Sequence, residues 1–203
     1  MFKNLFASKP ARGEKSLPII VVSGLPRSGT SMMMKMLAEG GLGIVTDALR
    51  AADDDNPNGY YEFEPVKQMT EGGTAWLDNA HGKVVKVISA LLEHLPPQNQ
   101  YRVVFMERAL PEVLASQKKM LAHRNEQPKI SDAEMEAQFR DHLRAVKYWL
   151  ARQPNLGVLY VDYNRMMASP ADDCQRVAGF IDVPVDVEKM LSVPNQALYR
   201  NRA

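Results

Sequence analysis

The segment from Leu17 to Glu39 constrains the fold of this chain more than any other part of the sequence. It begins with a short run of largely β-branched residues (LPIIVVS), a composition typical of a strand buried on both faces. Gly24–Gly29 then interrupts the run, and Thr30–Glu39 (TSMMMKMLAE) follows with good helix formers before Gly40. The order strand, tight loop, helix predicts the opening unit of a parallel α/β sheet.

Strand and helix patterns continue to alternate along the rest of the chain. Further strands are predicted at Lys83–Ser89, Tyr101–Glu107 and Gly157–Asp162, with a short one at Gly43–Thr46. Helices are predicted at Leu110–Ala122, at Pro170–Ile181, and from a capping box at Ser131 to about Gln153, and residues 66–80 are weakly helical. The segments Ala51–Pro65 and Leu91–Gln100 are predicted to be loops.

This alternation predicts a three-layer, P-loop NTPase-like α/β fold, in which a mostly parallel sheet carries helices on both faces. In such sheets, ligands bind beyond the carboxyl ends of the strands. The positions that follow Ser23, Ser89, Glu107 and Asp162 are therefore the places to look for a functional site.

The length of 203 residues fits one domain of this kind, which we place at residues 17–203 after a loose polar tail at 1–16. The formal net charge of +1 provides no overall field for nucleic acid or an anionic membrane, so any anion site must be local. No stretch is apolar enough for a signal peptide or a transmembrane helix, which makes a cytoplasmic location the expectation. The single cysteine, Cys174, excludes an intrachain disulfide, and the oligomeric state stays open.

The loop after the first strand, Gly24–Ser31 (GLPRSGTS), has the features of an anion-binding site. Its two glycines are separated by four residues, as in a Walker A loop, and glycines allow backbone N–H groups to turn toward an oxyanion. The following helix adds its positive N-terminal end, where Thr30 and Ser31 supply hydroxyl donors. The Walker A lysine is missing, and the loop carries Arg27 instead. We therefore expect one compact oxyanion group there, rather than a triphosphate with magnesium.

The segment VVSGLPRSGTS resembles the 5′-phosphosulfate loop of the sulfotransferases that use 3′-phosphoadenosine 5′-phosphosulfate (PAPS). The family pattern is proline, lysine or arginine, serine, glycine, threonine, then serine or threonine. The chain matches it at Pro26, Arg27, Ser28, Gly29, Thr30 and Ser31. The resemblance implies a PAPS-dependent sulfotransferase in which these residues bind the donor, and it is closer to short bacterial-type members than to cytosolic animal ones.

The same family has a second signature, an arginine at the end of a later strand and a serine eight residues on. Arg108 follows the predicted strand YRVVFME, and Ser116 lies eight positions later in the predicted helix. Arginine offers a planar fork of donors to a phosphate, and serine adds one hydroxyl donor. The resemblance therefore implies that Arg108 and Ser116 bind the 3′-phosphate, a group that PAPS has and ATP lacks.

In-line sulfuryl transfer needs cations that stabilise the transferring group and the leaving phosphate, and it needs no metal. Arg27 and Lys86 are the predicted cations. Lys86 matches a lysine in a family stretch that VVKVISALLEHLP resembles. No His/Cys cluster has the spacing of a metal site.

The acceptor's proton must go to a base, and here the sequence departs from the family. The family's histidine falls on Ile88, which cannot accept a proton. Glu62, in the aromatic-rich loop NPNGYYEFEP, is the predicted base because its Gly-Tyr-Tyr-Glu run resembles that of similar bacterial members. A carboxylate among aromatic side chains can also have a raised pKa, which suits acid–base chemistry. Glu64 and His94 are the remaining candidates.

Other functions stay open on the sequence alone. A P-loop kinase would use Asp162 as a magnesium ligand, although nothing replaces its lysine, and a non-catalytic nucleotide-binding module would keep the loop and lack the base. The aromatic residues that indicate a partly apolar acceptor pocket are Tyr60, Tyr61, Phe63 and Trp76. The acceptor is expected to be a small molecule or a carbohydrate. The roles of Arg200 and Arg202 stay open.

Overall fold

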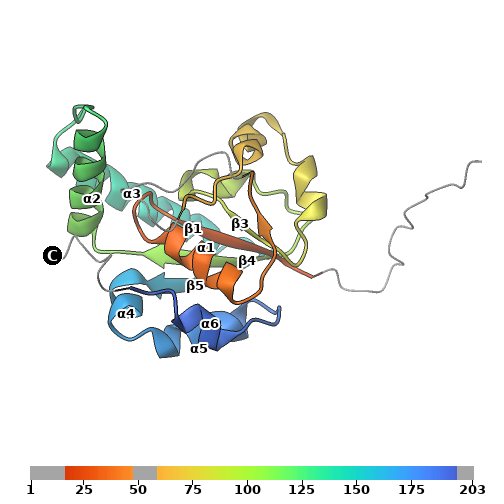
Figure 1. The fold of residues 1–203 in the computed structure, drawn as a ribbon. Helices are drawn as coiled ribbons and strands as arrows, with labels where there is room; N and C mark the ends of the chain where they lie inside the picture. Colours follow the sequence, from red (N-terminus) through yellow and green to blue (C-terminus); the bar gives the residue numbers. More distant parts are fainter. Residues whose placement is uncertain (1–16, 48–58, 196–203) are drawn as a thin grey trace, which may run out of the picture.

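Five parallel strands form a single sheet in the computed structural model, which describes residues 17–47 and 59–195 (Figure 1). The strands are β1 Ile19–Gly24, β2 Ile44–Val45, β3 Val84–Lys86, β4 Tyr101–Glu107 and β5 Leu156–Asp162. Their order across the sheet is β2-β3-β1-β4-β5, and every neighbouring pair is parallel. All five carboxyl ends therefore lie at one edge.

Strand β1 lies in the middle of this sheet, which explains its uninterrupted apolar sequence. All six of its residues are buried, and it pairs with β4 along its whole length. Ile20 and Val22 pack into the core on one face of the sheet, and Ile19 and Val21 pack into the core on the other face. Because neither face meets water, the strand has no alternation of polar and apolar side chains.

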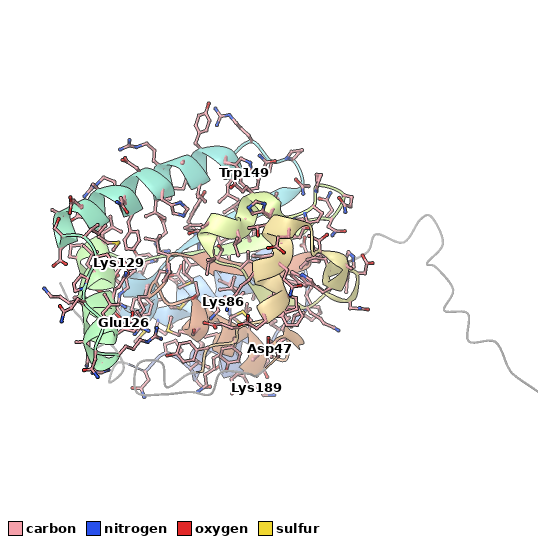
Figure 2. All side chains as sticks on the ribbon, turned by 90° about the horizontal axis from the view of Figure 1, so that it is seen from above. Asp47, Lys86, Glu126, Lys129, Trp149 and Lys189 are labelled. Carbon is pink, nitrogen blue, oxygen red and sulfur yellow. The ribbon has the colours of Figure 1, made fainter. Side chains whose placement is uncertain are left out.

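Helices cover both faces of the sheet. One layer contains α1 Thr30–Glu39, α4 Tyr163–Ala168, α5 Pro170–Phe180 and α6 Val187–Leu191. The other contains α3 Asp132–Leu150 and three 3₁₀ helices, η1 Glu64–Glu71, η2 Ala75–Asn79 and η3 Ser89–His94. Figure 2 shows Trp149 of α3 in one outer layer, Lys86 of β3 in the middle and Lys189 of α6 on the opposite side. The predicted three-layer α/β fold is confirmed.

Most of the predicted helices are present, and the capping box that opens α3 is formed. The Ser131 hydroxyl accepts a hydrogen bond from the Glu134 N–H at 3.2 Å, and the Glu134 carboxylate accepts one from the Ser131 N–H at 2.9 Å. The Ser131 hydroxyl also donates to the Glu134 carboxylate at 2.7 Å, and this bond, together with the one from the Ser131 N–H, lowers the pKa of Glu134. Helix α2, Leu110–His123, follows β4 as predicted and packs against α3.

The short helices α4 and α6 were not predicted. Aspartates cap both: Asp162 Oδ1 accepts from the Arg165 N–H at 2.7 Å, and Asp186 Oδ1 accepts from the Lys189 N–H at 3.1 Å. Helices of this length show no 3.6-residue periodicity in sequence. Asp162, a possible magnesium ligand on the sequence, is thus the cap of α4.

Two other boundaries differ from the prediction. Helix η3 occupies the first part of the segment Leu91–Gln100, which was predicted to be a loop, and β3 is shorter than Lys83–Ser89. The Val87 N–H still donates to the Val22 carbonyl at 3.0 Å, so pairing with β1 continues past the end of β3. The predicted tail at 1–16, the loop residues 51–58, and the C-terminal Arg200 and Arg202 lie outside the described residues.

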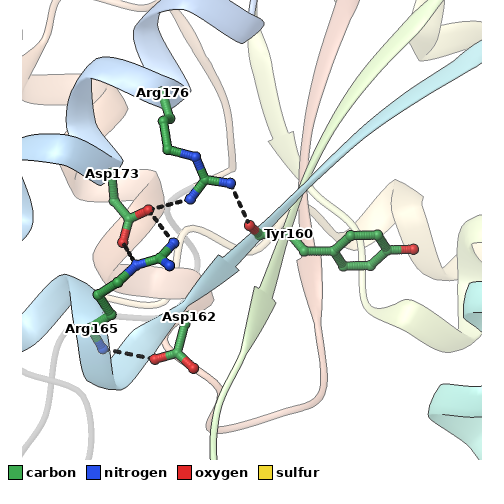
Figure 3. Close-up of polar contacts among 5 residues, drawn as sticks. All are labelled: Tyr160, Asp162, Arg165, Asp173 and Arg176. Atoms are coloured by element: carbon green, nitrogen blue, oxygen red, sulfur yellow. Dashed lines mark hydrogen bonds and ion pairs between the residues drawn. The ribbon is translucent and has the colours of Figure 1, made fainter.

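A buried carboxylate ties β5 to the helices that follow it (Figure 3). Asp173 of α5, which is 0% exposed, accepts hydrogen bonds from Arg165 Nε at 2.8 Å and from Arg176 Nη1 at 2.5 Å. Arg176 also donates to the Tyr160 carbonyl of β5 at 3.5 Å. Burial opposes ionisation of Asp173, but the two guanidinium groups outweigh this effect and hold its pKa below the ordinary value.

Candidate active site

The loop Gly24–Gly29 joins β1 to α1 at the carboxyl edge of the sheet, as predicted. A Cβ on Gly24, which has φ 144°, would lie 2.6 Å from the Met106 carbonyl oxygen. A Cβ on Gly29, which has φ 99°, would lie 2.3 Å from a Tyr163 ring carbon. Neither position accommodates a side chain, so the loop keeps a bare backbone at both ends. The buried Ser28 hydroxyl donates to the Leu25 carbonyl at 2.7 Å and closes the turn.

Arg27 lies where the two predicted motifs meet. Its φ of 70° is in the left-handed region, which is uncommon for a residue other than glycine. Arg27 Nε donates to Ser116 Oγ at 2.9 Å. In turn, Arg108 Nη1 donates to the Arg27 carbonyl at 3.1 Å, across 81 positions of sequence. The structure therefore brings Arg27, Arg108 and Ser116 together into one site.

Three side chains that the sequence did not single out surround Arg108, whose side chain is only 7% exposed. Arg108 Nε donates to Glu112 Oε2 at 2.8 Å, and Asn164 Nδ2 donates to Glu112 Oε1 at 2.7 Å. The Arg108 guanidinium also lies over the Tyr163 ring, 4.5 Å from its centroid. Burial raises the pKa of Tyr163, so the ring is a neutral phenol at physiological pH.

The remaining motif residues lie within this loop and in the first turn of the helix that follows it. Pro26 is exposed, and Thr30 and Ser31 are half-buried in the first turn of α1. Two guanidinium groups, a helix N-terminus and several hydroxyls therefore converge at one end of the sheet. This set of donors fits compact, doubly or singly charged oxyanions such as phosphate and sulfonate.

Lys86 and Glu62 lie along the same edge, on the β2 side of the sheet. The Lys86 ammonium group donates to the Tyr60 carbonyl, which places it at the carboxyl edge as predicted. The Glu62 carbonyl accepts from the Thr46 hydroxyl at 2.9 Å and from the Asp47 N–H at 3.3 Å. Because β2 and β3 are adjacent, these contacts fasten the loop that carries Glu62 next to Lys86.

The other predicted bases have different surroundings. Glu64 is exposed, and its carboxylate forms an ion pair with Lys67 at 2.6 Å. His94, at the end of η3, lies 3.9 Å from the Glu93 carboxylate. Glu62 and His94 are both half-buried, so Glu64 is the most exposed of the three candidates.

The aromatic residues that were expected to line an acceptor pocket do not form one surface. Tyr61 packs against the core on the α1 face, whereas Phe63 and Trp76 pack on the opposite core, with their ring centroids 5.3 Å apart. Tyr60 is buried. Ile88, just beyond β3, is 44% exposed and presents an apolar side chain at the carboxyl edge instead.

A polar pair next to Ile88 was also missed. The buried Ser89 hydroxyl lies 2.8 Å from Nε2 of His142, which comes from α3. The family's histidine position falls on Ile88, so α3 supplies an imidazole close to that position from a segment 53 residues away. No local pattern in the sequence could connect the two.

Two further structural findings concern metals and membranes. Within residues 17–47 and 59–195, no group of three or more His, Cys, Asp or Glu side chains is arranged to hold a metal ion. None of the helices in the described part of the chain is long and apolar enough to cross a membrane.

The sequence of the chain matches a family profile described as the sulfotransferase domain, over residues 17–201. Since this match spans most of the chain, the protein belongs to the sulfotransferase family, whose members catalyse sulfuryl transfer. No curated protein matches the chain significantly in sequence.

Solved structures of sulfotransferases have the same fold. The mouse sulfotransferase SULT7A1, solved in complex with PAP, aligns with a TM-score of 0.58 and 15% identity over 94% of this chain and 68% of its own. The sulfotransferase domain from the curacin biosynthetic pathway aligns with a TM-score of 0.53 and 12% identity, over 90% of this chain and 79% of its own. The sulfotransferase domain of the Synechococcus PCC 7002 olefin synthase aligns with a TM-score of 0.51 and 12% identity, over 97% of this chain and 86% of its own.

Proposed function

We propose that this chain transfers the sulfuryl group of PAPS to a hydroxyl or amine group on a small-molecule or carbohydrate acceptor. The observation that carries the proposal is the contact between the two motifs, in which Arg108 binds the Arg27 carbonyl and Arg27 binds Ser116. Two motifs that are far apart in sequence and rich in donors for anions thus lie in contact with each other, which supports one site for both charged ends of the donor. The mouse relative solved with PAP supports the same donor class.

The donor's two charged ends are assigned to different parts of this site. Residues 26–31 bind the 5′-phosphosulfate through the loop backbone, the Thr30 and Ser31 hydroxyls and the N-terminus of α1. Arg108 and Ser116 bind the 3′-phosphate. Charge-assisted contacts of this kind discriminate PAPS from ATP, which has no 3′-phosphate.

Three side chains carry out the chemical step. Arg27 stabilises the transferring group in the transition state, and the Lys86 ammonium neutralises the charge that grows on the oxygen of the leaving phosphate. Glu62 takes the proton from the acceptor as the acceptor oxygen attacks in line with the departing phosphate. The contacts of Lys86 with Tyr60 and of Thr46 with Glu62 fasten the loop that carries Glu62 beside the adjacent strands β2 and β3, which supports a joint role.

The acceptor binds on the β2–β3 side of the site. Ile88 contributes an exposed apolar contact there, in place of the histidine that relatives carry. The absence of a metal requirement, a cytoplasmic location and the absence of nucleic-acid or membrane partners remain predictions that rest on the sequence.

Isothermal titration calorimetry with three nucleotides tests the donor assignment. The ligands are PAP (3′-phosphoadenosine 5′-phosphate), adenosine 5′-monophosphate (5′-AMP), and ATP with and without magnesium. The contacts to the 3′-phosphate should stabilise the PAP complex by about 2–4 kcal/mol relative to 5′-AMP, or roughly 30- to 1,000-fold in Kd. Equal Kd values for PAP and 5′-AMP would remove the assignment, and tighter binding of ATP with magnesium would favour the kinase alternative.

A further inference from the structure

The feature that goes furthest beyond the two family motifs is the buried acid beside the donor site. Glu112 is 2% exposed, and both of its carboxylate oxygens are engaged, one by Arg108 and the other by Asn164. A negative charge next to a site for a 3′-phosphate weakens phosphate binding by repulsion. A buried glutamate at this position is therefore expected to help phosphate binding in some other way that offsets the repulsion.

The compensating effect is geometric, because Arg108 is held from three directions. Glu112 binds its Nε, the Tyr163 ring supports the flat face of its guanidinium, and the Arg27 carbonyl accepts from its Nη1. The guanidinium group has five N–H donors in a fixed plane, so fixing two of its nitrogens sets the direction of all five. The direction of the donors that face the nucleotide therefore depends on Glu112.

Asn164 extends this arrangement to a third strand. It lies in α4, directly after β5, and its side-chain amide donates to Glu112 at 2.7 Å. Only a carboxylate can accept from Arg108 with one oxygen and from Asn164 with the other. Shortening the acid by one methylene keeps its charge but moves both oxygens away from these partners.

We propose that Glu112, oriented by Asn164, is a positioning residue that sets the guanidinium of Arg108 for recognition of the 3′-phosphate. This inference rests on the proposed function. The competing explanation is that the Glu112–Arg108 pair only stabilises the fold, or that Glu112 only complements the N-terminal dipole of α2. The two explanations differ in one measurable quantity, the preference for PAP over 5′-AMP.

The experiment measures Kd for PAP and for 5′-AMP by calorimetry in the wild-type chain and in Glu112→Asp, Glu112→Gln and Asn164→Ser. Glu112→Asp keeps the charge but shortens the side chain. The Kd ratio, defined as the Kd of 5′-AMP divided by the Kd of PAP, should therefore fall by roughly tenfold or more. In Glu112→Gln the amide can still accept from Arg108 while Asn164 turns its own oxygen toward the new amide, so this variant should retain most of the preference. The Kd ratio of Asn164→Ser should lie between those of Glu112→Asp and Glu112→Gln.

Asp173→Asn is the matched control, because Asp173 is also a buried acid that binds two side chains, but on α5. It should lower thermal stability and leave the Kd ratio unchanged. A Kd ratio that stays at the wild-type value in Glu112→Asp, with only stability reduced, would overturn the positioning role. A wild-type ratio near one would instead overturn the donor assignment itself, so the two failures are distinguishable. If Glu112→Asp does not fold, Asn164→Ser decides the question with the same ratio.

Discussion

The two halves of the site are built in different ways. On the donor side, several contacts join side chains with little exposure, as between Arg108 and Glu112 and between Arg27 and Ser116, in addition to the contact of Arg108 with the Arg27 carbonyl. On the acceptor side, the contacts reach the main chain: Lys86 binds the Tyr60 carbonyl, and Thr46 binds the Glu62 carbonyl. A substitution on the donor side therefore breaks its neighbours' contacts, whereas the acceptor loop can change side chains and keep its anchors. We therefore expect the choice of donor to tolerate little change in sequence, whereas the choice of acceptor can change with the side chains of the loop.

The strongest test of this comparison is Arg27→Ala, on the donor side. In the proposed mechanism Arg27 contacts the transferring group, so its contact should tighten in the transition state. We expect kcat to fall by on the order of 10²–10³-fold and the Kd of PAP to change much less, measured by a sulfuryl-transfer assay and calorimetry. Arg27→Lys is the control that keeps the charge. Equal losses in kcat and in PAP affinity would make Arg27 a binding residue only.

On the acceptor side, Glu62→Gln keeps the shape of the side chain and removes its basicity. The main-chain anchors of the loop should survive, because they involve the Glu62 carbonyl. We expect kcat to fall by on the order of a hundredfold or more, with the affinity for PAP nearly unchanged.

The same change at Glu64, which lies two residues further along the loop, is the matched comparison for Glu62→Gln. A Glu62→Gln enzyme within about threefold of the wild-type rate would exclude Glu62, because a base contributes far more. Glu64→Gln, His94→Asn and His142→Asn would then be measured to find the base.

Asp173→Asn tests whether stability outside the site can change independently of the site. The folded-state pKa of Asp173 is held below its unfolded value, so its stabilisation is present above the unfolded pKa and is lost as pH falls through the folded pKa. The variant should be less stable near neutral pH by on the order of 1–3 kcal/mol, and its free energy of unfolding should fall less between about pH 5 and pH 2. Urea unfolding over this pH range measures both.

Asp172→Asn, in the same turn but exposed, is the control for Asp173→Asn. It should change neither the stability at neutral pH nor the acid dependence by more than about 0.5 kcal/mol. Identical acid dependence in wild type and Asp173→Asn would mean that the two arginines do not stabilise the carboxylate.

The smallest expected effect is that of EDTA. The loop has Thr30 at the position of the Walker A lysine that NTPases use with magnesium, and its cation, Arg27, lies inside the loop; the sulfonate also carries less charge to neutralise. Turnover should therefore stay within about twofold of the untreated rate, since only a metal-dependent step would respond to chelation. Loss of turnover that magnesium restores would indicate kinase-like chemistry on both sides of the site.

Local patterns predicted much of this fold. The strand β1, the glycine loop and α1 were readable because each has a strong local signature. Arg108 and Ser116 were singled out because their spacing resembles a family signature, and the structure brings them together with Arg27, while their role in donor binding stays a prediction. The helix α4 was not readable, since six residues cannot display helical periodicity. Its cap, Asp162, is also the last residue of β5, so the sequence indicated only the strand end there.

The residues that the sequence did not reveal act through tertiary contacts. Glu112 carried a partial signal, because a position four residues after Arg108 in a helix is its neighbour. Asn164 reaches Glu112 from 52 positions away, and His142 reaches Ser89 from 53, so their partners depend on how the strands are ordered. Strand order is a property of the whole chain that no single segment encodes.

The donor site also has a place in the order of folding. Its contacts join the carboxyl ends of β1, β4 and β5. Long segments of chain must therefore close into loops before these contacts can form. Non-local contacts of this kind form slowly, because chain entropy is lost before the contacts compensate for it. A fragment that ends before Asn164 lacks the contact that Asn164 makes with Glu112 beside Arg108. We therefore expect the proposed nucleotide site to be among the last parts of the molecule to form, so that nucleotide binding would require a complete central sheet.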